Sequence, residues 1–261
     1  ELQKNEKYYD QNAVALKKVV ISIVKDTAAG INMYNSHRAD IAPLNQVFVD
    51  AYRQTPDYKD LELASTSYIL FDFKNRFFQN KHIRQALSLA LDRSLITSQI
   101  LKDGSKPAGS LVPPSLYGMG TKSFRQGGEV VKPNQKEARK LFIRGLKELG
   151  LKKPPQELNM ITNDTLIKRD VAVAIQGQWR NVLGLGVKLN ALPLKTQLKK
   201  ASSHEFDMMM LGWNADTDSP HSFFEIFQAK NPMNYAQYNN AQYEKLVNQA
   251  IVEGNPTKQY D

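Results

Sequence analysis

The sequence predicts an α/β fold with a small mixed sheet flanked by helices. From about Tyr68 onward, predicted strands and helices alternate along the chain, which is typical of this fold class. The apolar run Met208–Asn214 is short and ends at turn-forming residues, so it predicts a strand buried on both faces. The 261 residues, of which 41% are hydrophobic and 23% charged, suffice for one large domain or two small ones.

Residues 1–60 predict a β-α-β-α segment. The β-branched run Val19–Val24 predicts a strand, and a helix capped by Asp26 or Thr27 follows it. Arg38–Ala42 predicts a short strand and Leu44–Arg53 a second helix. These strands need further neighbours, because two strands alone do not make a stable sheet.

The middle of the chain predicts one long extended stretch and two helices. Leu61–Phe73 is extended with a polar centre, and the apolar stripe Ile83–Leu91 predicts a helix. Asp92 is expected to cap a second helix, Leu95–Leu101. Residues 103–133 are rich in proline and glycine and predict a long irregular segment of the kind that is often functional.

The remaining elements continue the alternation. An Asn-initiated capping box, Asn134–Glu137, begins a helix that Gly150 ends, and Asp164 is expected to cap a long helix that Gly184 ends. The other expected elements are strands Leu158–Ile161 and Val187–Leu192 and helices Thr196–Ala201 and Asn240–Val252. The inward-facing residues expected in the last helix are Tyr243, Leu246, Val247, Ala250 and Ile251.

Composition and motifs exclude several classes of function. Without cysteine the chain has no disulfide, thiol nucleophile or Cys-ligated zinc. The four histidines make no metal-binding pattern, and no nucleophile elbow or phosphate-binding loop occurs, so we expect no catalytic residue, metal or cofactor. No apolar run reaches membrane-spanning length, and the polar first residues contain no signal peptide, so any such peptide would lie upstream.

The net charge of +9 raises the question of nucleic-acid binding. Lys and Arg are spread along the chain, mostly on predicted helix faces, and form no basic stripe interleaved with stacking aromatic residues. We therefore expect a solvated surface and no nucleic-acid partner. The alternative is a loose attraction to an anionic cell envelope or membrane surface.

The end of the predicted strand Met208–Asn214 carries the candidate site. Trp213 and Asp216 lie at its carboxyl end, where open α/β sheets bind ligands. A carboxylate at this edge can pair with the ammonium group of a ligand, whose burial without an anion is costly. The alternative is that Asp216 caps a turn or the next helix, although Asp218 or Ser219, just before a proline, is the better helix cap.

Three segments, in order along the chain, resemble one known family. They are Lys4–Asp10, with Tyr9 where the family usually has Trp, then Tyr68–Phe73 with Phe78 and His82–Arg93, and finally Gly212–Asp216 with Asp218–Pro220 and Ser222–Phe224. The family is that of the extracytoplasmic oligopeptide-binding proteins, the solute receptors of ABC peptide importers (solute-binding protein family 5). The resemblance covers mainly the second lobe of these proteins.

The resemblance implies a fold like that of the type II periplasmic binding proteins. Residues 1–66 would form the C-terminal part of lobe I with the hinge entry, and residues 67–261 would form lobe II, a wall of the ligand cleft. The ligand-binding residues that it implies are Gly212, Trp213, Asn214, Ala215 and Asp216. Asp216 would anchor the amine of an extended peptide whose backbone pairs with the strand, and hinge closure would deliver the ligand to the permease. Thr217 stands where the family often has Tyr, so the preferred ligand length and chemistry stay open.

Other functions remain as alternatives. The same fold can hold an oligosaccharide, haem, a metal chelate or a signalling peptide, and an enzyme of unknown class is a further alternative without a supporting motif. The expected partners are a peptide and the ABC permease. We expect a monomer located outside the cytoplasm, in the periplasm or lipid-anchored on the outer face of the membrane, with no membrane span of its own. The chain alone is expected to bind peptide weakly or undetectably.

Overall fold

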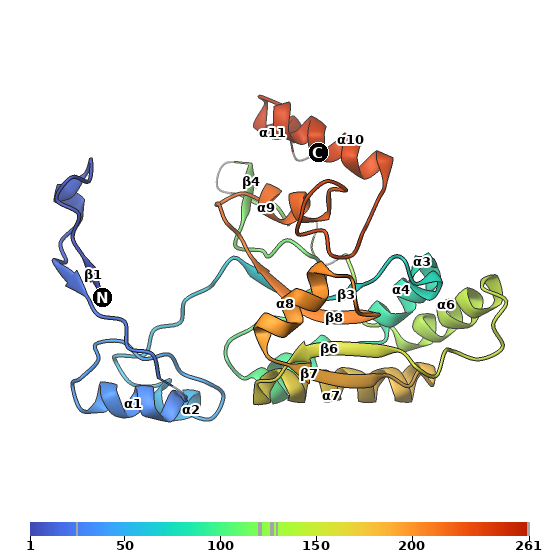
Figure 1. The fold of residues 1–261 in the computed structure, drawn as a ribbon, viewed down its shortest axis with the longest axis horizontal. Coiled ribbons are helices and arrows are strands. Elements are labelled where there is room, and N and C mark those ends of the chain that lie inside the picture. Colours follow the sequence, from blue (N-terminus) through green and yellow to red (C-terminus); the bar gives the residue numbers. More distant parts are fainter. Residues whose placement is uncertain (25, 120–121, 126–127, 129, 260–261) are drawn as a thin grey trace. The chain divides into compact units, whose positions relative to one another are not determined.

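The structure, a computed structural model, describes residues 1–24, 26–119, 122–125, 128 and 130–259. The chain divides into two units, Glu1–Tyr58 and Lys59–Asp261 (Figure 1). The elements of the first unit are β1 (Leu2–Gln3), the 3₁₀ turn Gln11–Ala13, β2 (Lys18–Val19), α1 (Thr27–Asn35) and α2 (Val49–Tyr52). The predicted cap of α1 is confirmed, because the Asp26 carboxylate accepts a hydrogen bond of 2.7 Å from the Ala29 N–H.

The first unit holds less regular structure than the sequence predicts. The predicted strand Val19–Val24 is wrong beyond Val19, because β1 pairs only with Lys18 and Val19. From Val20 to Val24 the run has no strand partner among the described residues, and Ile23 is 98% exposed. Arg38–Ala42 forms no strand, and the predicted helix Leu44–Arg53 shrinks to α2.

The second unit contains the α/β fold that the sequence predicts. Its strands are β3 (Ser65–Phe71), β4 (Tyr117–Met119), β5 (Lys122–Ser123), β6 (Asn159–Asn163), β7 (Lys188–Leu192) and β8 (Met208–Asn214). Its helices are α3 (Arg76–Gln79), α4 (Lys81–Leu89), α5 (Arg93–Leu95), the π-helix Ile96–Leu101, α6 (Gln135–Glu148), α7 (Leu166–Leu183), α8 (Leu194–Ser202), α9 (His221–Phe224), the 3₁₀ turn Glu225–Phe227, α10 (Ala241–Val252) and α11 (Pro256–Gln259). The predicted boundary at residues 66 and 67 falls inside β3, and the assignment to lobes stays a prediction.

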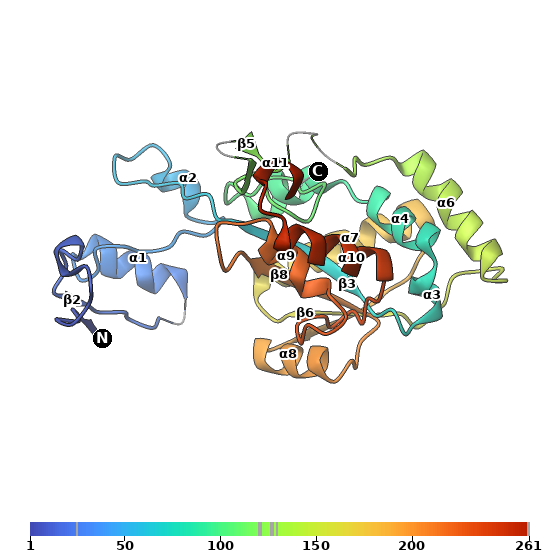
Figure 2. The ribbon, with the colours of Figure 1, turned by 90° about the horizontal axis from the view of Figure 1, so that it is seen from above.

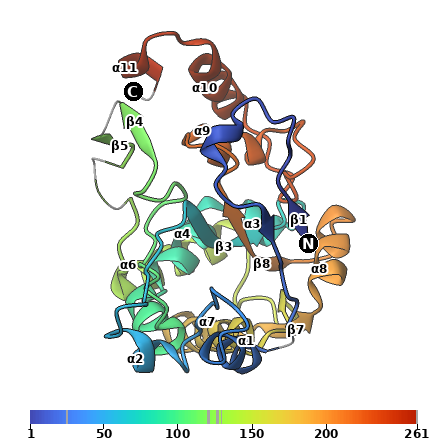
Figure 3. The same ribbon diagram turned by 90° about the vertical axis from the view of Figure 1, so that its left-hand side faces the viewer.

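The four-stranded sheet is mixed, as predicted, with the order β3-β8-β6-β7. β3 and β8 run antiparallel side by side, and β8-β6 and β6-β7 are parallel pairs (Figures 1 and 3). Alternate residues face opposite sides of the sheet. Met208 and Met160 therefore join the core on the side of α4, α6 and α7, whereas Met209 and Ile161 join the core on the side of α8 (Figure 2).

A buried tryptophan joins the helices of the larger core. Trp179 on α7 is fully buried, and its indole Nε1–H donates a hydrogen bond of 2.9 Å to the carbonyl oxygen of Leu87 on α4. Burying an aromatic ring of this size stabilises the fold by about 3 kcal/mol, and its one polar atom is satisfied. The hydrogen bond also fixes the position of α7 against α4.

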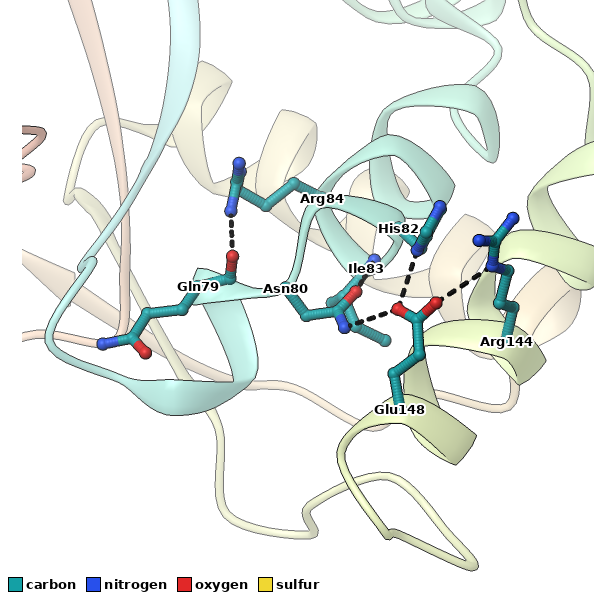
Figure 4. A network of polar contacts seen from close by, with 7 residues as sticks. All are labelled: Gln79, Asn80, His82, Ile83, Arg84, Arg144 and Glu148. Carbon is teal, nitrogen blue, oxygen red and sulfur yellow. Dashed lines mark hydrogen bonds and ion pairs between the residues drawn. The ribbon is translucent and has the colours of Figure 1, made fainter. Parts of the chain in front are cut away.

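A close helix pair, α4 and α6, lies at the edge of this core. A Cβ on Gly145 would lie 2.7 Å from Cδ1 of the fully buried Ile83, so only glycine allows this approach. Above the contact, Glu148 accepts hydrogen bonds of 2.9 Å from Asn80 Nδ2 and from Arg144 Nε, and His82 Nδ1 lies 2.8 Å from its Oε2 (Figure 4). The bonds from Asn80, His82 and Arg144 lower the pKa of Glu148 to about 2.

Most of the predicted helix caps are confirmed. Asn134 Oδ1 accepts a hydrogen bond of 3.0 Å from the Glu137 N–H, and Asp92 caps α5 in the same way. Asn240, which was predicted only as the first residue of its helix, caps α10. The prediction that Asp164 caps α7 is wrong. Thr165 stands at that position without a side-chain bond, and the preceding Asn163 side chain accepts a hydrogen bond from the Thr165 N–H instead.

The last long helix differs from the prediction in what it buries. Val247 on α10 is buried, but Leu246 is 56% exposed and Ile251 is 51% exposed. The apolar stripe is present in the sequence, yet within the described residues only part of it meets the core. Periodicity predicted the helix correctly and overestimated the width of its buried face.

Candidate functional site

The two halves of β8 have different environments. Met208 and Met209 are fully buried, whereas Gly212 and Asn214 are exposed. The prediction of a strand buried on both faces therefore holds only for the first half. The second half ends in the predicted site residues, with one face of the sheet open where Gly212 and Asn214 lie opposite Ser67 and Ser65 of β3.

One backbone edge of this second half is unpaired. The Ala215 N–H donates a hydrogen bond of 2.8 Å to the Ala64 carbonyl oxygen, so Ala215 and, by alternation, Trp213 direct their backbone groups toward β3. Gly212 and Asn214 direct theirs to the other edge. There β8 pairs with β6 only at Met208 and Met209, and no described residue bonds the Gly212 or Asn214 backbone.

The fold itself does not require glycine at position 212. Its φ is not in the left-handed region, and a Cβ would meet Ser67 Oγ and the Thr66 carbonyl oxygen at 3.5 Å, an ordinary van der Waals distance. By contrast, Gly145 has no room for a Cβ. The absent side chain at Gly212 leaves the open face and the free backbone edge accessible to another chain.

The side chain of Trp213 turns to the covered face of the sheet. It packs with Ala215 against a small core of Val112, Leu116 and Phe223. Its indole Nε1–H donates to the hydroxyl of Ser222 at 3.2 Å. Core packing thus accounts for the ring itself, while the backbone of Trp213 belongs to the ladder with β3.

Ser222 holds the turn that follows β8. Its side chain is buried, and its Oγ accepts hydrogen bonds from Trp213 Nε1 at 3.2 Å and from the Asp216 N–H at 2.9 Å. The Ser222–Phe224 segment is part of the sequence resemblance, but sequence reasoning assigned Ser222 no role. The signal that could have found it is a lone serine at the start of an apolar helix, six residues after an acid.

The Asp216 carboxylate is exposed and has no hydrogen-bond or ion-pair partner among the described residues. It caps neither the turn nor α9. Pro220 stands at the helix N-cap, and the Ser219 hydroxyl accepts a hydrogen bond of 3.3 Å from the His221 N–H. The side chain at the end of the open edge is therefore available to a cation.

A pocket of the second unit lies at the other end of the strand. It has a volume of about 300 Å³ and is lined by residues that include Asn159, Phe206 and Asp207. It shares no residue with the segment Gly212–Asp216. Asp207 is engaged there by Asn75 and Asn159, so this pocket does not contain the unpaired carboxylate. The candidate site is an open edge and not a closed cavity.

Comparison with known proteins places these features in a family. A family model described as bacterial extracellular solute-binding proteins, family 5, matches residues 1–235. The dipeptide-binding protein DppE of Bacillus subtilis is 29% identical over 250 residues, which are 95% of this chain and 46% of that protein. The oligopeptide-binding protein OppA of the same organism is 28% identical over 98% of this chain and 48% of its own length.

Solved structures agree in fold. Listeria monocytogenes OppA bound to peptide is 33% identical with a TM-score of 0.81, over 94% of this chain and 50% of that one. The pheromone receptor PrgZ is 27% identical with a TM-score of 0.82, over 99% of this chain and 50% of that one. The chain spans about half the length of the curated relatives it matches. Among the described residues, no helix has the length and apolar character needed to cross a bilayer.

Proposed function

Because the chain belongs to the bacterial extracellular solute-binding proteins of family 5, we propose that it contributes one wall of a binding site for an extended peptide. Relatives named for dipeptide and oligopeptide binding support a peptide as the solute. The observation that carries the proposal is the unpaired edge of β8 at Gly212 and Asn214, which leads to the unpartnered carboxylate of Asp216.

The free edge suits the main chain of a peptide. Gly212 and Asn214 each offer a backbone N–H and C=O to a strand laid beside β8, which is how β-augmentation works. Such bonds read the backbone and not the side chains of the ligand. The open space at Gly212 lets that backbone come close. A binding mode of this kind tolerates many peptide sequences.

Asp216 suits the amino terminus of the same peptide. The carboxylate follows the unpaired edge by two residues, and no described residue neutralises it. A free ammonium there would form a charge-assisted pair, which fixes where the bound peptide begins. Ser222 holds the Asp216 backbone at the turn, so the carboxylate starts from a fixed position. Trp213 and Ala215 support the edge from the covered face.

The wider role is that of a solute receptor of an ABC importer outside the cytoplasm. In this proposal residues 1–66 belong to lobe I and 67–261 to lobe II, and a monomeric receptor closes around its ligand by a hinge and hands it to the permease. The receptor is either free in the periplasm or lipid-anchored. One relative is named a probable deoxycholate-binding protein, so a non-peptide solute is the alternative that the experiment must separate.

The test is a titration of the isotope-labelled chain with trialanine and N-acetyl-trialanine, followed by NMR amide shifts. With only one wall present, we expect a Kd on the order of 1 mM. Shifts should cluster at Gly212, Asn214 and Asp216, and acetylation should abolish them because it removes the ammonium charge. Asp216→Asn should weaken trialanine binding at least about tenfold, the scale of one charged hydrogen bond.

Two results would separate the parts of the proposal. Gly212→Ala should crowd the open face beside the free edge and weaken the shifts with little change in stability, because the position tolerates a Cβ. Equal binding of both peptides, or an unchanged affinity of Asp216→Asn, would overturn the amine anchor. Shifts confined to other surfaces would overturn the β8 site altogether.

A further inference from the structure

Most of the net charge of the chain lies in one short segment. Residues 132–153 contain eight Lys and Arg against two Glu, a net charge of +6 out of the +9 of the whole chain. All eight cationic residues are exposed, and five of them belong to α6. The charge is therefore concentrated on one helix and its flanks.

On α6 the lysines share one side of the helix. The buried residues Ala138, Phe142, Gly145 and Leu146 face the core with α4 and α7. With 3.6 residues per turn, the residues on the opposite side are Lys136, Lys140, Ile143 and Lys147. Arg139 flanks the buried face, and its Nε–H donates a hydrogen bond of 3.0 Å to the Val182 carbonyl oxygen on α7. In Figures 1 and 2, α6 lies at the periphery of the second unit, and its outer side meets no other element of that unit.

The acids of this segment do not neutralise the outer face. Glu148 is engaged by Asn80, His82 and Arg144 at the border with α4. Glu137 forms a long ion pair of 3.5 Å with Lys140. Lys136 and Lys147 make no ion pair with any described residue. The outer face thus keeps a net positive charge, because the Glu137–Lys140 pair leaves Lys136 and Lys147 uncompensated.

An apolar side chain stands in the middle of the cations. Ile143 is 67% exposed, and on the helix it lies between Lys136, Lys140 and Lys147. An exposed aliphatic residue among lysines can enter the interface of an anionic bilayer while the ammonium groups meet its headgroups. The aliphatic stems of the lysines can follow such a side chain into the headgroup layer.

We propose that the outer face of α6 docks on the anionic phospholipid headgroups of a membrane surface. Lys136, Lys140 and Lys147 attract the phosphates, and Ile143 enters the boundary between headgroups and acyl chains. This contact would hold the second unit beside the outer surface of the cell membrane, which is where an extracellular protein meets a bilayer. The proposal does not depend on the peptide site, because no residue of Gly212–Asp216 takes part.

Lipid is favoured over an acidic protein by the kind of residue present. Lysine is depleted at protein–protein interfaces, which are enriched in aromatic residues and arginine. The outer face of α6 has three lysines and no aromatic residue. Long lysines that keep their rotamer freedom suit a diffuse, fluid array of charges better than a fixed set of carboxylates.

The test is flotation of the purified chain with vesicles of phosphatidylcholine, with or without phosphatidylglycerol, at low and high salt. We expect binding only with phosphatidylglycerol at low salt. The triple variant K136Q/K140Q/K147Q should bind roughly 100-fold more weakly, because each lysine contributes about a fivefold gain in affinity. Ile143→Ser should keep the salt dependence and lose about fivefold in affinity.

The matched control is K188Q/K195Q/K199Q, which removes the same charge from exposed lysines on β7 and α8. It should retain nearly wild-type binding. Equal losses of vesicle binding in both triple variants would overturn the proposal, because binding would then depend on the net charge of the chain and not on α6. No binding to phosphatidylglycerol, together with binding to polyglutamate, would overturn it in favour of an acidic protein partner. Urea midpoints verify that all variants are folded.

Discussion

Two surface carboxylates of the second unit are in opposite situations. Glu148, at the junction of α4 and α6, remains 38% exposed yet is contacted by Asn80, His82 and Arg144. Asp216, at the end of β8, is exposed and contacted by no described side chain. The Glu148 carboxylate accepts its hydrogen bonds from within the fold. The Asp216 carboxylate accepts none from the described residues and is therefore open to a ligand.

The difference also appears in the glycines nearby. Gly145 sits where a Cβ would overlap the buried Ile83, so it is required by helix packing. Gly212 sits where a Cβ would make ordinary contacts, so packing does not require it. The contacts within the fold thus explain why a glycine and an acid stand at the helix junction. They do not explain why a glycine and an acid stand at the strand end. That contrast is what makes the strand end a functional candidate.

The largest expected effect comes from breaking the helix junction with Gly145→Ala. The added Cβ forces Ile83 or α6 to move, and overpacking of this kind costs about 2 kcal/mol. Urea unfolding followed by circular dichroism measures the loss. The peptide-induced shifts at Gly212 and Asn214 should be retained in the folded variant.

Gly177→Ala is the matched control for that substitution. Gly177 is also inside a helix, α7, but a Cβ there meets nothing within 4 Å. The change should stabilise the protein by about 0.5–1 kcal/mol, since alanine is the better helix former. Destabilisation by both substitutions would contradict the packing explanation for Gly145.

The second effect concerns Ser222, the structural support of the strand end. Ser222→Ala leaves the Trp213 indole and the Asp216 N–H without their acceptor, at a cost of about 1.5 kcal/mol. It should also weaken trialanine binding, because the turn that carries Asp216 loses its anchor. Urea unfolding and the NMR titration measure the two effects. The exposed Ser105→Ala should change neither, and an unaffected titration in Ser222→Ala would show that the turn holds Asp216 without the serine.

Features determined by local sequence were predicted correctly. The capping box at Asn134 and the stop at Gly150 delimit α6, because a cap needs only its own neighbours. The alternation of strands and helices predicted the mixed sheet, since each element carries its own periodicity. The position of Asp216 beyond β8 followed from the same local pattern.

Features that depend on distant partners were missed. Val20–Val24 has strand propensity without a paired neighbour among the described residues, so propensity alone overpredicts the strand. The contacts of Glu148 with His82 and Asn80 join residues that are 66 and 68 positions apart in the sequence, and no local pattern reports them. For the same reason the sequence could name Asp216 but not state that its carboxylate lacks a partner.

The smallest expected effect, and the one that sharpens the contrast between the two acids, is that of Glu148→Gln. Its hydrogen-bond donors hold the pKa of Glu148 at about 2, below the ordinary 4.5. A depressed pKa means that the carboxylate stabilises the fold above about pH 4.5, and that this contribution is lost as the pH falls toward 2. The variant should therefore unfold at a lower urea concentration than the wild type at neutral pH, by less than Gly145→Ala does. The difference should shrink steadily below pH 4.5.

Glu157→Gln, at an exposed acid without a side-chain partner among the described residues, should show no such difference. The difference in urea midpoint between wild type and Glu148→Gln could instead stay constant down to pH 3. The three donors would then not stabilise the ionised form of Glu148, and Glu148 would resemble Asp216.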